Sequence, residues 1–244
     1  MNSYRNDVKI DYEKSIKLND ISNAVFIAHL LLLFINALKE VIPQWIIALL
    51  CFIYILLGFI DDLFLLNKAE KERRKTLVSD AYKKNLSDKK TKKYYNNSVS
   101  PSVKKLGVDS FESSYYTREN LEIMIKTSSI KVLITLIAFF IFIFTCDNKK
   151  LIILLFETLF STDILYKYIK MIYYKIEVNN IYDAFFHMFV SNKYTDSNEA
   201  ELICNVMDYE CIKNYCHIQL SEKKFKKINN TQIDKWKEIK KDIK

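Results

Sequence analysis

Polar side chains interrupt one of the most apolar stretches of the chain, LLFETLFSTDIL. Glu157, Thr158, Ser161 and Thr162 are spaced so that all four fall on one side of a helix. A carboxylate at the centre of a membrane helix costs about 2.5–3.5 kcal/mol on an insertion scale, so such residues face a partner helix or water. A ring of carboxylates in an oligomer favours cations. These four residues are therefore candidates to line a conduction path.

Two further polar residues lie in another apolar stretch, VFIAHLLLLFINAL. His29 and Asn36 are seven residues apart, which again places them on one side of a helix. We count both among the pore-lining candidates. The alternative for all six residues is that they hydrogen-bond between helices inside a bundle.

Three thiols and an imidazole cluster near the C-terminus: Cys204, Cys211, Cys216 and His217. Their spacing lacks the paired C-x-x-C that typifies zinc sites, so we expect no metal. On a helix, the cysteines fall near one apolar face. We predict that they are buried structural thiols, kept reduced in the cytosol.

Signatures of enzymatic chemistry are missing from the sequence. Gly58 and Gly107 are the only two glycines, too few for a glycine-rich phosphate loop. The three histidines, His29, His187 and His217, sit in unrelated contexts and form no H-E-x-x-H motif. We predict a protein that is not an enzyme and that uses no cofactor.

The elements that would position these residues are four apolar blocks: Ala24–Ile42, Gln44–Ile60, Ile130–Cys146 and Leu151–Tyr166. A helix needs roughly 17–25 residues to cross a bilayer. The blocks have almost no polar face, whereas the helices of soluble proteins normally have one. The sequence therefore predicts an all-α integral membrane protein with four spans, arranged as two transmembrane helical hairpins.

The basic residues predict the orientation of these spans. Of the 37 Lys and Arg residues, 33 fall in the three segments 1–23, 61–129 and 167–244. Segments rich in Lys and Arg stay on the cytoplasmic side of a membrane. We therefore predict a multi-pass protein of the inner (cell) membrane with both termini in the cytoplasm. The net charge of +8 then favours anionic lipid at that face, and we expect no nucleic acid partner.

This orientation divides the chain into five parts. They are a cytosolic lead-in (1–23), a first transmembrane hairpin (24–60), a cytosolic helical insert (61–129), a second hairpin (130–166) and cytosolic C-terminal helices (167–244). We expect the insert and the C-terminal helices to fold together, because neither carries enough apolar surface to form a core alone. The apolar residues of the insert that we expect to be buried by the C-terminal helices are Leu106, Val108, Phe111, Tyr115 and Tyr116.

Local signals predict where the helices outside the membrane begin and end. The lead-in helix should end near Asp20 or Ser22, and a helix following the second span should run from Asp61 to Lys93. Thr117 has the chemistry of an N-cap for a helix over Arg118–Ser129.

The order of these parts resembles the SMODS-associated four-transmembrane effectors and the related SLATT effectors of bacterial anti-phage defence. The segments that carry the resemblance are SNAVFIAHL before the first span, YYNN and SPSVKKLGVDSFESSYYTRENL in the insert, and DYE and WKEIK in the tail. No catalytic signature accompanies it.

The resemblance implies a homo-oligomeric membrane effector that permeabilises the inner membrane after a soluble cytosolic partner or a nucleotide signal activates it. A different function also fits the sequence. The chain would then be a non-conducting membrane sensor or scaffold that recruits a soluble defence partner.

Overall fold

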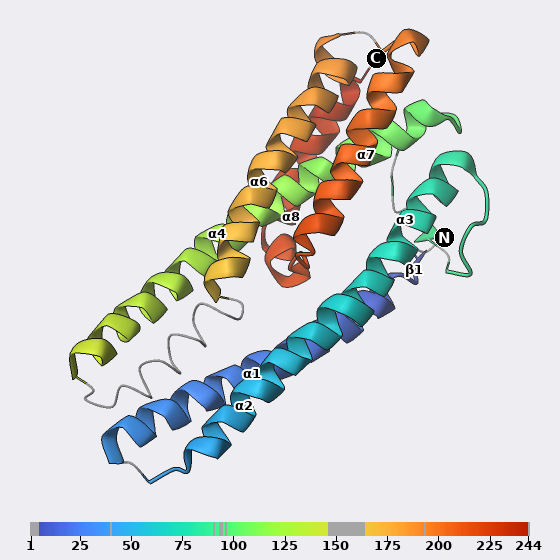
Figure 1. The fold of residues 1–244 in the computed structure, drawn as a ribbon. Coiled ribbons are helices and arrows are strands. Elements are labelled where there is room, and N and C mark those ends of the chain that lie inside the picture. Colours follow the sequence, from blue (N-terminus) through green and yellow to red (C-terminus); the bar gives the residue numbers. More distant parts are fainter. Residues whose placement is uncertain are drawn as a thin grey trace. The chain divides into compact units, whose positions relative to one another are not determined.

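The computed structural model describes residues 5–39, 41–89, 91–92, 95, 97–145, 164–192 and 194–243. These residues are helical apart from a two-residue antiparallel pairing of β1 (Arg5–Asn6) with β2 (Thr91–Lys92) and the connecting turns (Figure 1). The chain folds into two compact units. Unit 1 comprises Met1–Lys9, Lys68–Lys126 and Lys170–Lys244, and unit 2 comprises Ile10–Asn67 and Thr127–Ile169.

The helices of the first half are α1 (Lys9–Lys39), α2 (Gln44–Ile60), the π-helical turn η1 (Asp61–Leu66) and α3 (Asn67–Tyr82). The predicted helix end near Ser22 is wrong, because α1 continues without a break into the apolar stretch. The predicted helix to Lys93 is also wrong, because the chain leaves the helix at Lys83, which has a left-handed φ of 51°.

Helix α4 (Val103–Thr145) is a single element that begins with polar sequence and ends with apolar sequence. Thr117 therefore does not cap a helix, because it lies inside α4. The second half continues with α6 (Ile164–Phe186), η2 (His187–Ser191), η3 (Asp196–Asn198), α7 (Glu199–Cys216) and α8 (Glu222–Lys241).

In unit 2, α1 and α2 form a helical hairpin closed by the turn at Pro43. Leu33 and Ile47 are almost fully buried. The rings of Phe26 and Tyr54 meet with their centroids 5.1 Å apart. This packing of large side chains defines the inner face of the hairpin.

The core of unit 1 is aromatic. Phe111 on α4 is completely buried, and its ring contacts Phe185 on α6, Phe189 on η2 and Trp236 on α8 at centroid distances of 5.1–6.0 Å. The insert therefore packs against the helices that follow residue 170. Gly107 on α4 lies so close to the side chain of Leu202 on α7 that a Cβ at this position would require Leu202 to move.

Candidate functional site

Many large apolar side chains of unit 2 are exposed along its helices, unlike those of a helix pair in a soluble protein. The large apolar residues that lie at least 43% exposed on α1, α2 and the end of α4 are Ile10, Ile21, Ile27, Leu31, Ile35, Trp45, Leu49, Phe52, Leu56, Phe59, Ile130, Leu133, Ile134, Ile137, Phe140, Ile141 and Phe144. Soluble monomers rarely expose apolar surface on this scale, whereas helices in lipid must do so.

Three helices in the described residues are long and apolar enough to cross a membrane. They lie within Lys9–Leu33, Gln44–Tyr82 and Val103–Ile141. The predicted fourth span, Leu151–Tyr166, falls almost entirely outside the described residues. The structure thus supports a membrane protein with three candidate spans.

Four of the six predicted pore-lining residues, Glu157, Thr158, Ser161 and Thr162, also lie outside the described residues. The other two are in α1, and both are buried within the first hairpin. His29 is 1% exposed, and its Nδ1 lies 3.1 Å from the carbonyl oxygen of Ile47 on α2. The side-chain oxygen of Asn36 accepts a hydrogen bond of 2.9 Å from the backbone N–H of Ile42.

These two bonds connect α1 to its neighbour and to the turn between them. They satisfy polar groups inside an apolar hairpin. This agrees with the alternative that these residues form hydrogen bonds between helices and do not line a pore. A contribution of either residue to a conduction path stays a prediction.

Unit 1 contains a buried cluster of charges that connects α3 to α7. Arg73 donates from Nε to Glu70 at 2.8 Å and forms a second ion pair with Glu210 on α7. Lys213, also on α7, lies 3.7 Å from the other oxygen of Glu70. All four side chains are at most 16% exposed. Two carboxylates and two cations therefore neutralise one another away from water.

A buried hydrogen bond near this charge cluster connects α7 to a third helix, α4. The Thr117 hydroxyl on α4 lies 2.8 Å from the Tyr209 hydroxyl on α7, and both residues are buried. Burial raises the pKa of Tyr209, as it does that of Tyr174 on α6. Burial and the positive charge of Arg73 lower the pKa of Lys213 to about 8, against the pull of the carboxylates.

The charge cluster cannot be recognised from the sequence. Glu70 and Arg73, like Glu210 and Lys213, are three residues apart, a spacing that places each pair on one helix face. That signal is common on solvated helices. The two pairs meet only because the chain brings residues 137 positions apart into contact.

A second group of buried titratable side chains lies on α4, well before the apolar part of that helix. Asp109 is completely buried and accepts a hydrogen bond from the amide of Asn97. Glu112, one turn later, is 8% exposed. Burial raises the pKa of each carboxyl to about 7, and the neighbouring Asp109 charge raises that of Glu112 further. The hydrogen bond from Asn97 and the charge of Lys105 lower the pKa of Asp109 in part. The charge of Lys240 and a hydrogen bond from Trp236 do the same for Glu112.

We expect the stability of unit 1 to depend on pH because of this acid pair. Both pKa values are higher in the folded chain than in the unfolded chain, so the folded state holds extra protons between about pH 4 and pH 7. The stabilisation is complete below pH 4 and is lost as the pH rises through 7. Asp109→Asn keeps an acceptor for Asn97 and should raise the free energy of unfolding at pH 8 by about 2 kcal/mol.

Thermal unfolding of the full chain in detergent at pH 6 and pH 8 measures this effect. The wild type should melt at a lower temperature at pH 8, and Asp109→Asn should reduce that difference. Equal pH dependence of the two chains would show that Asp109 does not titrate in this range.

The structure corrects the prediction for the cysteines. Cys216 is buried, with burial raising the pKa of its thiol to about 11, but Cys204 and Cys211 are exposed on α7. Helical spacing places Cys204 and Cys211 on a common face, but that face points away from the core. Within the described ranges, no group of three or more His, Cys, Asp or Glu residues is arranged to hold a metal ion.

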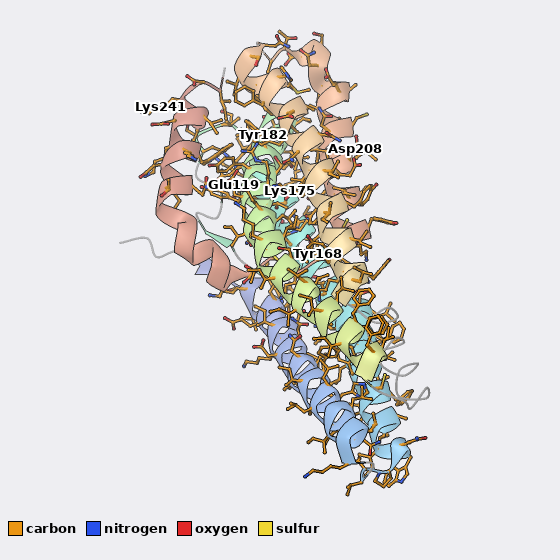
Figure 2. All side chains as sticks on the ribbon, turned by 90° about the vertical axis from the view of Figure 1, so that its left-hand side faces the viewer. Glu119, Tyr168, Lys175, Tyr182, Asp208 and Lys241 are labelled. Carbon is orange, nitrogen blue, oxygen red and sulfur yellow. The ribbon has the colours of Figure 1, made fainter. Side chains whose placement is uncertain are left out.

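An open groove of about 320 Å³ lies between α4, α6 and α8 in unit 1. Figure 2 labels Glu119, one of the residues of α4 that line it. Its rim alternates in charge, with Arg118 and Lys235 among Glu119, Glu238 and Asp242. The guanidinium of Arg118 lies 3.9 Å from the ring centroid of Tyr182, which is a cation–π contact. This arrangement is typical of a solvated helix surface and offers no activated nucleophile.

No family model, curated protein or solved structure matches this chain.

Proposed function

We propose that the chain is a membrane effector of bacterial anti-phage defence, which oligomerises and permeabilises the inner membrane when a soluble partner or nucleotide signal activates it. The proposal includes four spans, both termini in the cytoplasm and no enzymatic activity. The observation that carries it is the exposed apolar surface of unit 2, attached by continuous helices to a unit with a closed aromatic core.

The three chain segments that make up unit 1 support the four-span arrangement. A compact unit lies on one side of a membrane, so a chain that leaves it and comes back crosses an even number of times. The chain leaves unit 1 after Lys9 and returns at Lys68, and α1 and α2 account for two crossings. It leaves again after Lys126 and returns at Lys170. The apolar end of α4 accounts for one crossing, and the block Leu151–Tyr166 is the return crossing in this proposal.

The proposed conduction path uses the fourth span, with Glu157 at its polar face. A carboxylate in lipid is costly, and Thr158, Ser161 and Thr162 share its side of the helix. A ring formed by several copies would provide water and counter-ions for these groups. The resting state must be closed, because a constitutive leak would kill the host.

Inducible expression in bacteria with a membrane-potential dye tests this function. Cells that produce the active chain should depolarise, and Glu157→Gln should change the extent or the ion selectivity of the depolarisation without changing the amount of chain in the membrane. Phe52→Asp is the matched control, because a carboxylate at this lipid-exposed position of α2 should impair insertion. If inserted wild-type chain leaves the potential unchanged under activating conditions, permeabilisation is wrong.

The second candidate function, a non-conducting sensor or scaffold, is supported by the same closed unit 1. Its surface is available to a soluble partner whether or not the membrane part conducts. In the same experiment, the scaffold predicts unchanged membrane potential and indistinguishable behaviour of Glu157→Gln.

A further inference from the structure

Helix α7 exposes an apolar stripe on the side opposite its buried face. The buried face consists of Leu202, Val206, Tyr209, Ile212 and Cys216. The exposed α7 stripe consists of Ala200, Ile203, Cys204, Met207, Cys211 and Tyr215. Met207 is 59% exposed and Tyr215 is 66% exposed, values that are unusual for large apolar side chains in a unit with its own closed core.

The spacing within the α7 stripe is that of a helix–helix seam. Ala200, Cys204, Met207 and Cys211 alternate steps of four and three residues, which is the period of 3.5 that keeps a seam against a parallel partner helix. No charged residue interrupts these four positions. Small and flexible side chains at the seam allow close approach of the two backbones.

The charges beside the α7 stripe are compatible with a second copy of the same helix. Glu201 and Asp208 are exposed on one edge of the stripe, and Figure 2 shows Asp208 at the outer surface of the helix. In a parallel pair with two-fold symmetry, this edge of one helix lies on the opposite side of the seam from the same edge of its partner. The acidic residues of the two copies therefore do not face one another.

Membrane insertion strengthens the argument for a second copy. Two copies in one bilayer have the same orientation, so they are related by rotation about the membrane normal. For α7 helices that run along the membrane normal, such a rotation makes the two helices parallel and brings their identical residues to the same height. A parallel seam requires that register, whereas a soluble partner would have to be aligned by other contacts.

We propose that the α7 stripe is a self-association surface, on which α7 packs in parallel against α7 of a second copy. This inference rests on the proposed oligomeric membrane effector and assigns a surface to its assembly. In the pair, Cys204 lies opposite Cys204 of the partner subunit, and Cys211 lies opposite Cys211 of the partner subunit. The Cα atoms of two facing residues in a two-helix seam are about 6 Å apart, which is within the range that a disulfide can bridge.

Oxidation of native membranes tests the surface without added probes. Copper phenanthroline removes two electrons from a pair of facing thiols, which lose two protons and form one disulfide, while Cu(II) is reduced and then reoxidised by oxygen. The full-length chain should give a covalent dimer on a non-reducing gel. The double variant Cys204→Ser, Cys211→Ser should lose at least nine-tenths of that dimer, while the other native cysteines remain.

Two variants separate a specific seam from random collision. Asp208→Cys, placed in the double serine variant, carries a thiol at the acidic edge of the same helix and should crosslink at least tenfold less than the wild type. Met207→Glu in the wild-type chain places a charge in the seam and should suppress the dimer to a similar extent.

Equal dimer yields from the wild type and Asp208→Cys would overturn the proposal, as would full crosslinking of Met207→Glu or no dimer at all. This result is separable from the test of function. Depolarisation without the dimer would support the proposed function and contradict self-association through the α7 stripe. The dimer without depolarisation would support self-association and contradict permeabilisation.

Discussion

Arg73→Met should destabilise unit 1 by about 3–5 kcal/mol, because it removes the central cation of the charge cluster. Arg73 pairs with Glu70 on its own helix and with Glu210 on α7, and all three side chains are at most 16% exposed. Without Arg73, the buried carboxylates of Glu70 and Glu210 lose the cation that lies between them, and Lys213 lies 3.7 Å from Glu70. The variant retains most of the apolar stem of the side chain, so the loss reports on charge.

The buried thiol of Cys216 on α7 reports this loss in the full-length chain. Cys216 is 1% exposed and should react with an alkylating reagent only when the unit opens. A destabilisation of about 3 kcal/mol corresponds to an alkylation rate about a hundredfold higher, if opening and closing are fast relative to the reaction. Mass spectrometry of the peptide containing Cys216 separates this signal from that of the exposed cysteines.

Arg74→Met is the matched control. Arg74 is the next residue on α3, but its hydrogen bond to Asn214 is exposed to solvent. We expect a change of less than about 1 kcal/mol. Adding Glu210→Gln to Arg73→Met should recover part of the lost stability by removing one uncompensated charge. A cluster that contributes only packing would give equal rates for Arg73→Met and Arg74→Met and no recovery.

The sequence predicts the apolar helices because their signal is local. Long runs such as VFIAHLLLLFINAL and VLITLIAFFIFIF have no polar face, so lipid is the environment they fit without knowledge of the rest of the fold. The helical class is confirmed for the described residues, which contain three candidate spans.

Helix boundaries and the charge cluster depend on contacts that a local pattern does not contain. Thr117 has the chemistry of a cap, but its hydroxyl lies against Tyr209, 92 positions away, and the helix runs through it. The prediction that the cysteines share one face holds for Cys204 and Cys211 but not for Cys216, which is buried. The helical period also does not say which face packs against the core. Arg73 is one of several basic residues in NKAEKERRK, and only its tertiary partner distinguishes it from Arg74.

Two hairpins that return to one cytosolic unit predict an all-or-none pattern of accessibility across the membrane. In the proposed arrangement, residues between paired spans lie outside the cell, and residues in unit 1 lie in the cytoplasm. Single cysteines at Lys39 and Asn148 probe the two turns, and single cysteines at Ser98 and Asn230 probe the insert and the C-terminal helices. Each is placed in a Cys146→Ser background, because Cys146 ends the third apolar block beside the outer turn. The other four native cysteines are embedded or cytoplasmic in this arrangement.

Labelling of intact cells with a membrane-impermeant maleimide is the most direct measurement of this arrangement. Lys39→Cys and Asn148→Cys should be modified in intact cells, and Ser98→Cys and Asn230→Cys should be modified only after the inner membrane is permeabilised. Modification of Ser98→Cys in intact cells, or protection of Asn148→Cys combined with exposure of Asn230→Cys, would contradict the four-span account.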